Sequence, residues 1–177
     1  MKQQIIDKTF VPYLNATTIE KEVSRMGAEI SREYQNKNPL FIAILNGAFM
    51  FASDLFKKIT IPAEISFIKL ASYKGTKSTG NVITAIGLEA DVYGRDVIIV
   101  EDIVDTGKTL SAYLPQLMHQ QPASLRICAL LHKKEATTHP LKIDYLGFEI
   151  PNLFVVGYGL DYNGFGRNLN QIMQLEP

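Results

Sequence analysis

Residues 96–110 constrain the fold more than any other part of the chain. They read Asp-Val-Ile-Ile-Val-Glu-Asp-Ile-Val-Asp-Thr-Gly-Lys-Thr-Leu. The β-branched run from Val97 to Val100 predicts a strand that is buried on both faces, as in a parallel sheet. Apolar residues at helical spacing begin at Leu110 and predict a helix. A buried strand that leads through a turn of small residues into a helix is typical of an α/β fold.

Two adjacent acids, Glu101 and Asp102, follow the buried run. Because burying an unpaired charge is costly, we expect both carboxylates to face a solvated crevice at the carboxyl end of the strand. Open α/β sheets bind their ligands in that crevice.

The turn from Asp105 to Thr109 presents unpaired backbone N–H groups at the start of a helix, which is a seat for a phosphate. Gly107-Lys108-Thr109 also looks like the end of a P-loop. A P-loop needs a glycine five residues before Gly107, where this chain has Asp102, so we reject a nucleotide hydrolase. The acids and the turn together suit a ligand with a sugar diol and a phosphate, whereas a ligand-free turn needs neither an acid pair nor Lys108.

The rest of the chain alternates helical and strand patterns. Thr17, with Glu20 three residues later, predicts a capping box at the start of an amphipathic helix that runs to about Tyr34. Pro115 is expected to kink or interrupt the helix after the phosphate turn. We expect an extended arm and loop over residues 1–16, and further strands over residues 40–45, 63–70, 82–87, 124–131 and 143–146.

Composition excludes several classes of protein. The formal net charge is zero without charged blocks, and no apolar run approaches transmembrane length, so we expect neither a nucleic-acid nor a membrane partner. Cys128 is the single cysteine, which fits a reducing, cytoplasmic compartment. The three histidines are scattered, without ligand spacing to a cysteine or to one another, which argues against a structural zinc site.

The stretch Val-Glu-Asp-Ile-Val-Asp-Thr-Gly-Lys-Thr-Leu resembles the phosphoribosyl-pyrophosphate (PRPP) signature of type I phosphoribosyltransferases, in the spelling of the hypoxanthine-guanine branch. The tail Phe-Val-Val-Gly-Tyr-Gly-Leu-Asp-Tyr-Asn, from Phe154, resembles the same branch. The resemblance implies a mainly parallel central sheet flanked by helices, with a small hood from both chain ends. It implies one domain over residues 1–177, with a core of about 37–150, a hood from about 1–16 and 147–177, and a lid loop of about 71–81.

The resemblance also assigns roles to individual residues. Those implied for the ribose and its 5′-phosphate are Glu101, Asp102, Asp105, Thr106, Gly107, Lys108 and Thr109. Those implied for pyrophosphate are Asn46, Gly47 and Arg167, although the family often has a basic residue in place of Asn46. Those implied for the purine are Lys133, Phe154, Val155 and Asp161, and those for Mg²⁺ are Glu101, Asp102 and Asp161.

The reaction implied is transfer of the phosphoribosyl group from PRPP to N9 of hypoxanthine or guanine. Asp105 is the candidate general base or hydrogen-bond partner at purine N7. Lys133 would donate to the exocyclic oxygen of a 6-oxopurine, so adenine is expected to be a poor substrate. Phe154 would stack on the base, and the backbone of Val155 would read its polar edge.

Residues 71–80 are polar and lack periodicity, which predicts a lid or a simple loop. Ser72-Tyr73 resembles the tip of the family's mobile loop, which closes over the substrates and excludes water. The family also suggests a homodimer or homotetramer, with residues 46–47 near an interface.

Two other functions are compatible with the same fold. A PRPP-sensing regulator without catalysis would usually carry a nucleic-acid-binding surface or an additional domain. A pyrimidine phosphoribosyltransferase would not need an aromatic residue and a lysine together, as in Phe154 and Lys133. Xanthine is a third base that the sequence leaves open beside hypoxanthine and guanine.

Overall fold

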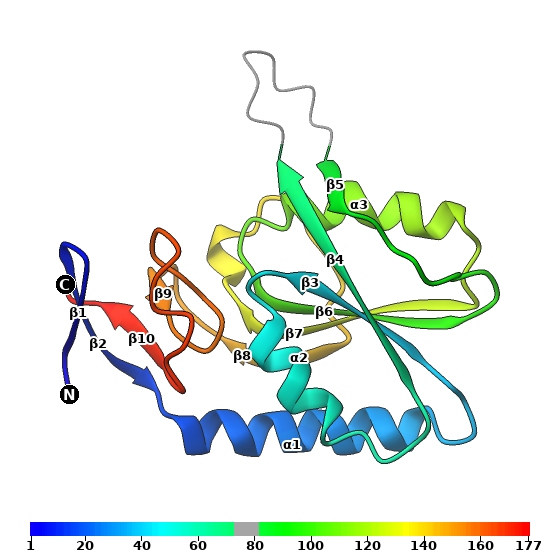
Figure 1. The fold of residues 1–177 in the computed structure, drawn as a ribbon, viewed down its shortest axis with the longest axis horizontal. Coiled ribbons are helices and arrows are strands. Elements are labelled where there is room, and N and C mark those ends of the chain that lie inside the picture. The colour runs from blue at the N-terminus through cyan, green and yellow to red at the C-terminus, as the bar shows by residue number, and fades with distance from the viewer. Residues whose placement is uncertain (73–81) are drawn as a thin grey trace.

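A six-stranded sheet forms the centre of the molecule (Figure 1). The computed structural model describes residues 1–72 and 82–177. The strands, in spatial order, are β5 (Val82–Ile86), β4 (Glu64–Ser72), β3 (Leu40–Leu45), β6 (Asp96–Val104), β7 (Ser124–His132) and β8 (Tyr145–Glu149). All neighbours pair in parallel except β5, which runs antiparallel to β4. The expected α/β fold with a mainly parallel sheet is confirmed.

Strand order reverses between β3 and β6. The chain adds β4 on one side of β3, and it adds β7 and then β8 on the far side of β6. A reversal of this kind leaves a crevice at the carboxyl ends of the two central strands, where open α/β sheets bind ligands.

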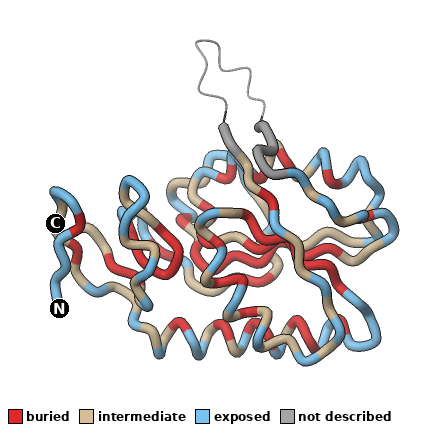
Figure 2. Tube along the Cα trace, in the orientation of Figure 1, coloured by how far each residue is buried: buried red, intermediate tan, exposed pale blue. Residues whose placement is uncertain are grey.

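Helices cover both faces of the sheet. Helices α1 (Ala16–Glu33) and α2 (Phe49–Phe56) pack on one face, and α3 (Lys108–His119) packs on the other. Alternate residues of β3 serve the two cores: Phe41 and Ala43 belong to the cluster that includes α1 and α2, whereas Ile42 faces the cluster that includes α3. Figure 2 shows the central strands as the most continuously buried part of the chain.

A second, four-stranded antiparallel sheet forms the expected hood. It consists of β1 (Gln3–Ile5), β2 (Lys8–Leu14), β10 (Ile172–Leu175) and β9 (Val155–Val156), in that spatial order. Ile5, Phe10, Val156 and Met173 are buried together between these strands. Since β2 pairs with β10, the two ends of the chain hold each other in place (Figure 1).

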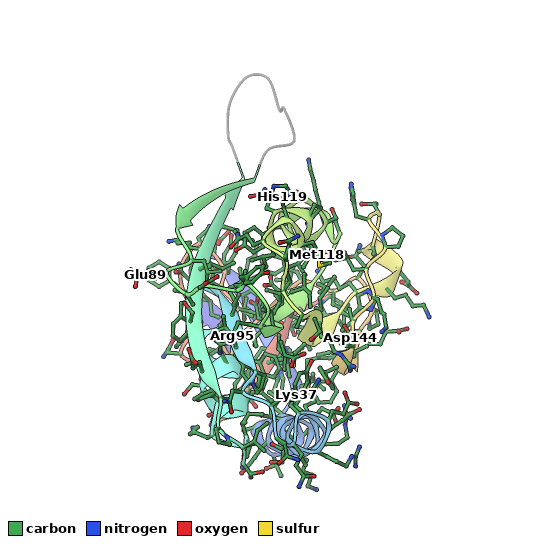
Figure 3. All side chains as sticks on the ribbon, turned by 90° about the vertical axis from the view of Figure 1, so that its right-hand side faces the viewer. Lys37, Glu89, Arg95, Met118, His119 and Asp144 are labelled. Atoms are coloured by element: carbon green, nitrogen blue, oxygen red, sulfur yellow. The ribbon has the colours of Figure 1, made fainter. Side chains whose placement is uncertain are left out.

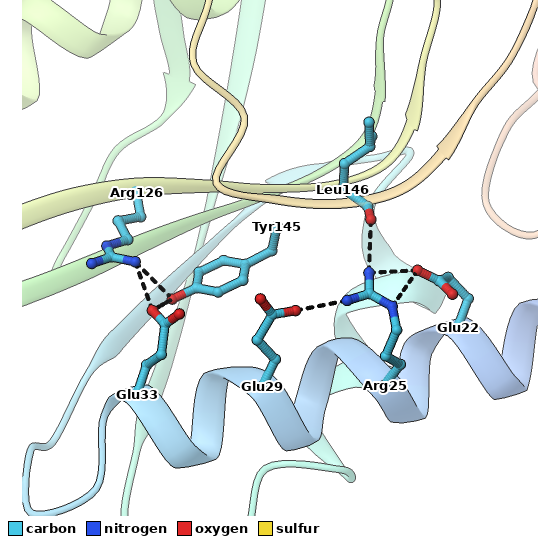
Figure 4. Close-up of polar contacts among 7 residues, drawn as sticks. All are labelled: Glu22, Arg25, Glu29, Glu33, Arg126, Tyr145 and Leu146. Carbon is cyan, nitrogen blue, oxygen red and sulfur yellow. Dashed lines mark hydrogen bonds and ion pairs between the residues drawn. The ribbon is translucent and has the colours of Figure 1, made fainter.

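A line of polar contacts fixes α1 against the edge of the central sheet (Figure 4). Arg25 donates to the backbone oxygen of Leu146 at 2.9 Å. The hydroxyl of Tyr145 donates to Glu33 at 2.6 Å, and Arg126 pairs with the same carboxylate at 2.6 Å. These contacts join α1 to β7 and β8, on which Lys133 and the tail depend for their position.

At the end opposite the hood, the side chains are of mixed charge (Figure 3). Lys37 lies 3.5 Å from Asp96, and Arg95 lies 3.0 Å from Glu64. This pairing agrees with the zero net charge of the chain. Among the described residues, no helix combines the length and the apolar character needed to cross a membrane.

Three local features differ, wholly or in part, from what the sequence predicts. The N-cap of α1 is Asn15, whose side chain accepts from the Thr18 N–H at 2.8 Å, and not Thr17. Helix α3 continues past Pro115 to His119, so of the expected kink or interruption the interruption is absent. Strand β6 extends to Val104, so Glu101 and Asp102 lie within the strand and not beyond its end. The reason is that the ladder with β7 continues to the pair Val104–His132, which outweighs the polar character of the two acids.

Candidate active site

A crevice opens at the carboxyl ends of β3, β6 and β7, where strand order reverses. Its main cavity, of about 340 Å³, is lined by Gly47, Asp102, Ile103, Asp105, Lys133, Phe154, Val155, Leu160, Asp161 and Arg167. An adjoining cavity of about 90 Å³ is lined by residues 101 and 103–110 and shares Ile103 and Asp105 with the first. Together they collect every predicted site residue except Asn46, Ser72 and Tyr73.

The three exceptions differ in kind. Asn46 is exposed beside the crevice, at the end of β3. Ser72 is the last residue of β4. Tyr73 and the rest of the expected lid, up to residue 81, lie outside the described residues.

The acid pair is more buried than expected. Asp102 is only 7% exposed, and Oε2 of Glu101 is buried without a hydrogen-bond partner among the described residues. Burial, and after it the neighbouring charge of Asp102, holds the pKa of Glu101 well above its usual range. Burial likewise raises the pKa of Asp102 to about 6, against the opposing effect of backbone N–H groups and Arg167. Both acids line the crevice, as expected, but they are far less solvated than expected, because both lie within β6 and not beyond its end.

The phosphate turn has the geometry expected of an anion seat. Gly107 adopts φ +76° and precedes the first residue of α3, Lys108. The Lys108 N–H donates to the Thr106 hydroxyl at 3.3 Å, and the Ser111 N–H donates to the Gly107 carbonyl at 2.9 Å. The N–H groups of the first helical turn have no intrahelical acceptor and lie beside the smaller cavity. This turn can bind an anion through its backbone.

Lys133 and Asp105 form an ion pair in the main cavity. Lys133 Nζ donates to Asp105 Oδ2 at 3.0 Å. The lysine side chain is 9% exposed, whereas that of Asp105 is 48% exposed. A lysine with a buried side chain therefore lies beside a carboxylate that solvent, or a ligand, can reach.

Aromatic rings border the same cavity. Phe154 is 46% exposed, and its ring centroid lies 6.2 Å from that of Phe10 and 5.9 Å from that of Tyr162. Phe10 lies on β2 of the hood, and Tyr162 lies in the segment between β9 and β10. Both rings therefore pack against Phe154 while part of its ring stays accessible. An exposed and supported ring is suited to stacking on a planar ligand.

The tail from Gly159 to Arg167 contacts the loop after β3. Arg167 donates to the Gly159 carbonyl and pairs with Asp161 Oδ1, both at 2.6 Å. Gly159 adopts φ +101°, and a side chain there would collide with the Gly47 carbonyl. A side chain on Gly47 would in turn collide with the Asp102 carboxylate. These close approaches, which the sequence did not reveal, bring the predicted pyrophosphate residues against the acid pair.

The carboxylates fit a magnesium ion that is shared with a ligand. Among the described residues, no group of three or more His, Cys, Asp or Glu side chains could hold a metal. Asp161 already accepts from Arg167 and from the Gly164 N–H at 2.6 Å. Mg²⁺ commonly uses one or two carboxylates together with water and substrate phosphate oxygens, which matches hard oxygen donors that are spread around one cavity.

Comparison with known proteins gives a consistent result. The model of the phosphoribosyl transferase domain matches residues 12–163. The hypoxanthine-guanine phosphoribosyltransferase of Lactococcus lactis subsp. lactis is 41% identical, over 100% of this chain and 97% of that protein. The corresponding enzyme of Bacillus subtilis is 42% identical, over 90% of this chain and 89% of the relative.

A solved structure agrees with these relatives. The crystal structure of a hypoxanthine phosphoribosyltransferase from Staphylococcus aureus superposes with a TM-score of 0.90 at 38% identity. The superposition covers 94% of this chain and 91% of that structure. With a family model over most of its length and close relatives over nearly all of it, the chain belongs to the phosphoribosyl transferase domain family.

Proposed function

We propose that this protein is a hypoxanthine-guanine phosphoribosyltransferase of purine salvage, which makes IMP or GMP and pyrophosphate from PRPP and a 6-oxopurine. The observation that carries the proposal is the Lys133–Asp105 pair at 3.0 Å, because it places a donor and an acceptor beside the phosphate turn in one crevice. The names of the relatives support the same activity.

The phosphate turn would bind the 5′-phosphate of PRPP, and Glu101 and Asp102 would hold the ribose end. Asp161 and the acid pair would hold Mg²⁺ together with PRPP oxygens. When bound, the ion would neutralise the pyrophosphate as it leaves. Arg167 has five donor N–H groups, so its contacts with Gly159 and Asp161 leave others for pyrophosphate.

In the bond-forming step, purine N9 attacks the anomeric carbon while the bond from that carbon to the pyrophosphate oxygen breaks. The exposed Asp105 carboxylate would accept the hydrogen bond or the proton of purine N7, which makes N9 more nucleophilic. Phe154 would stack on the base and Val155 would contact its edge, so both fix the angle of approach.

Lys133 would select the base. Its Nζ is a donor only, so it matches the 6-oxo group of hypoxanthine, guanine or xanthine. The 6-amino group of adenine would place donors against each other at the buried lysine, whose side chain is only 9% exposed. Because Lys133 Nζ already lies 3.0 Å from the Asp105 carboxylate, a bound base would contact both side chains at the same time.

The remaining assignments belong to the same proposal. We infer a single domain with the core, hood and lid limits given above, in which Asn46 and Gly47 bind pyrophosphate and Ser72 and Tyr73 belong to a lid. Cytoplasmic placement, which the single buried Cys128 supports, and assembly into a homodimer or homotetramer are likewise proposed.

The direct test is turnover of the purified protein with PRPP and Mg²⁺, with hypoxanthine, guanine, xanthine and adenine offered separately. Asp105→Asn should lose at least about a hundred-fold in kcat, since general acid–base groups typically contribute that much. Asp91→Asn is the control, because Asp91 is exposed, lies outside the described lining of both cavities, and accepts from the Tyr93 N–H at 2.9 Å.

Release of pyrophosphate with 6-oxopurines, but hardly with adenine, would support the proposal. Good turnover of adenine would contradict the role of Lys133. PRPP binding without turnover of any base would favour the non-catalytic regulator, an alternative for which the comparisons offer no support.

A further inference from the structure

Residues 137–139 form a short segment behind the phosphate turn. The N–H groups of Thr138 and His139 both donate to the Thr106 carbonyl, at 3.1 and 3.0 Å. The His139 carbonyl packs so closely against Gly107 that a side chain on this glycine would collide with it. As far as the structure describes the lining of the two cavities, none of the three residues belongs to it. The segment therefore acts on the turn only from behind.

The hydroxyl of Thr137 is a three-way junction. Its oxygen lies 3.0 Å from the backbone carbonyl of Asp105, 3.0 Å from that of Lys133, and 3.0 Å from Nε2 of His132. A hydroxyl has one proton to donate, which the two carbonyls can share, and its oxygen accepts from His132 in the tautomer that carries a proton on Nε2.

The contacts of Thr137 lie just beyond the end of the β6–β7 ladder, where Asp105 and Lys133 are no longer paired within the sheet. The ladder between β6 and β7 ends at the pair Val104–His132. One further backbone hydrogen bond, from the Lys133 N–H to the Val104 carbonyl at 2.9 Å, follows the ladder. Asp105 and Lys133 come directly after the ends of β6 and β7, and the side chain of Thr137 contacts the main chain of both.

We infer that Thr137 is a positioning residue, which sets the main chains of Asp105 and Lys133 so that their side chains meet one purine together. This inference rests on the proposed function. Since neighbouring backbone amides of the same segment hold Thr106, the junction also fixes the purine-reading pair relative to the phosphate turn. A displacement of about 1 Å at reacting groups costs on the order of a hundred-fold in rate, so a modest loosening is measurable.

The test compares three variants in the full-length protein. Thr137→Val keeps the shape of the side chain and removes the hydroxyl, whereas Thr137→Ser keeps the hydroxyl. Thr138→Val is the matched control, because Thr138 is the adjacent threonine and its hydroxyl contacts the Thr106 carbonyl at 3.4 Å and His139 Nδ1 at 3.0 Å, but neither Asp105 nor Lys133. Its backbone N–H, which donates to the Thr106 carbonyl at 3.1 Å, is kept in this variant.

We expect Thr137→Val to lower kcat/KM for hypoxanthine and guanine roughly ten-fold or more. We also expect it to lower the ratio of kcat/KM for hypoxanthine to kcat/KM for adenine. Thr137→Ser should restore both quantities, and Thr138→Val should leave both near wild type. A role in stability alone would lower the melting temperature without changing the ratio between the two bases. Equal kinetics for the two valine variants, or no rescue by serine, would overturn the inference.

Failure of the proposed function would be distinguishable. Wild-type protein without turnover would refute the function, and the positioning role would then be decided by amide hydrogen exchange in residues 105–108. Faster exchange in Thr137→Val, but not in Thr138→Val, would support the junction, and equal exchange would overturn it.

Discussion

Gly159→Ala tests the close approach between the tail and the loop after β3. Gly159 has φ +101° and faces the Gly47 carbonyl, whereas Gly164 has φ +88° with nothing within 4 Å of an added side chain. Alanine in a left-handed conformation costs about 1–2 kcal/mol at either site. At Gly159 the collision adds about 1–3 kcal/mol, which is typical of an overpacked contact.

Gly159→Ala should therefore lose about 2–5 kcal/mol of unfolding free energy, against about 1–2 kcal/mol for the control Gly164→Ala. For a chain of 177 residues, the difference corresponds to a melting temperature about 2–12 °C lower. Because Arg167 donates to the Gly159 carbonyl, Gly159→Ala should also raise KM for pyrophosphate in the reverse reaction. Urea denaturation and calorimetry measure the stability. Free energies that agree within about 0.5 kcal/mol would refute the close approach.

Three further predictions concern Lys133, Tyr158 and magnesium. Lys133→Met should lower kcat/KM for hypoxanthine roughly 10- to 100-fold, the value of a hydrogen bond to a charged donor, while Lys134→Met on the exposed neighbour should not. Tyr158→Phe removes the 2.6 Å hydrogen bond to Asp54 and should cost about 1 kcal/mol at pH 7 in urea denaturation. Burial raises the pKa of Asp54, but hydrogen bonds from Lys57 and Tyr158 outweigh it and leave the pKa below its ordinary value of 3.8. The stabilisation is therefore present above that pH, and the difference between wild type and Tyr158→Phe should shrink as the pH falls through and below it; a difference that grows in acid would contradict this. Removal of Mg²⁺ with EDTA should abolish turnover reversibly without lowering the melting temperature of the substrate-free protein, because the described residues provide no complete metal cage.

Elements with a continuous apolar pattern were predictable from the sequence. The run Leu40–Leu45 became β3 with the expected bounds, and Ile19, Val23, Met26 and Ile30 form the buried stripe of α1. The limits of elements that depend on pairing with a partner strand were not predictable from the sequence. The acids Glu101 and Asp102 look like the end of a strand, yet the ladder with β7 carries β6 to Val104.

The site divides in the same way. The phosphate turn and the acid pair follow from residues that are adjacent in sequence, so local chemistry was sufficient to find them. Phe154 and Asp161 would have been assigned to core and loop without the family resemblance. Thr137 gave no signal at all, because its role arises only when β6 and β7 end side by side and bring Asp105 and Lys133 within reach of one hydroxyl.

The pairing of β2 with β10 also sets the order in which the site can be completed during synthesis. Leu14 and Ile172 are partners in this ladder, so the hood cannot close until residues near 172 have left the ribosome. The phosphate turn and its supporting segment lie between residues 105 and 139 and leave the ribosome earlier. Under the proposed function, a nascent chain would therefore complete its phosphate seat before the hood, which supports Phe154 through Phe10, has closed. Contacts of such long sequence separation also form late in folding.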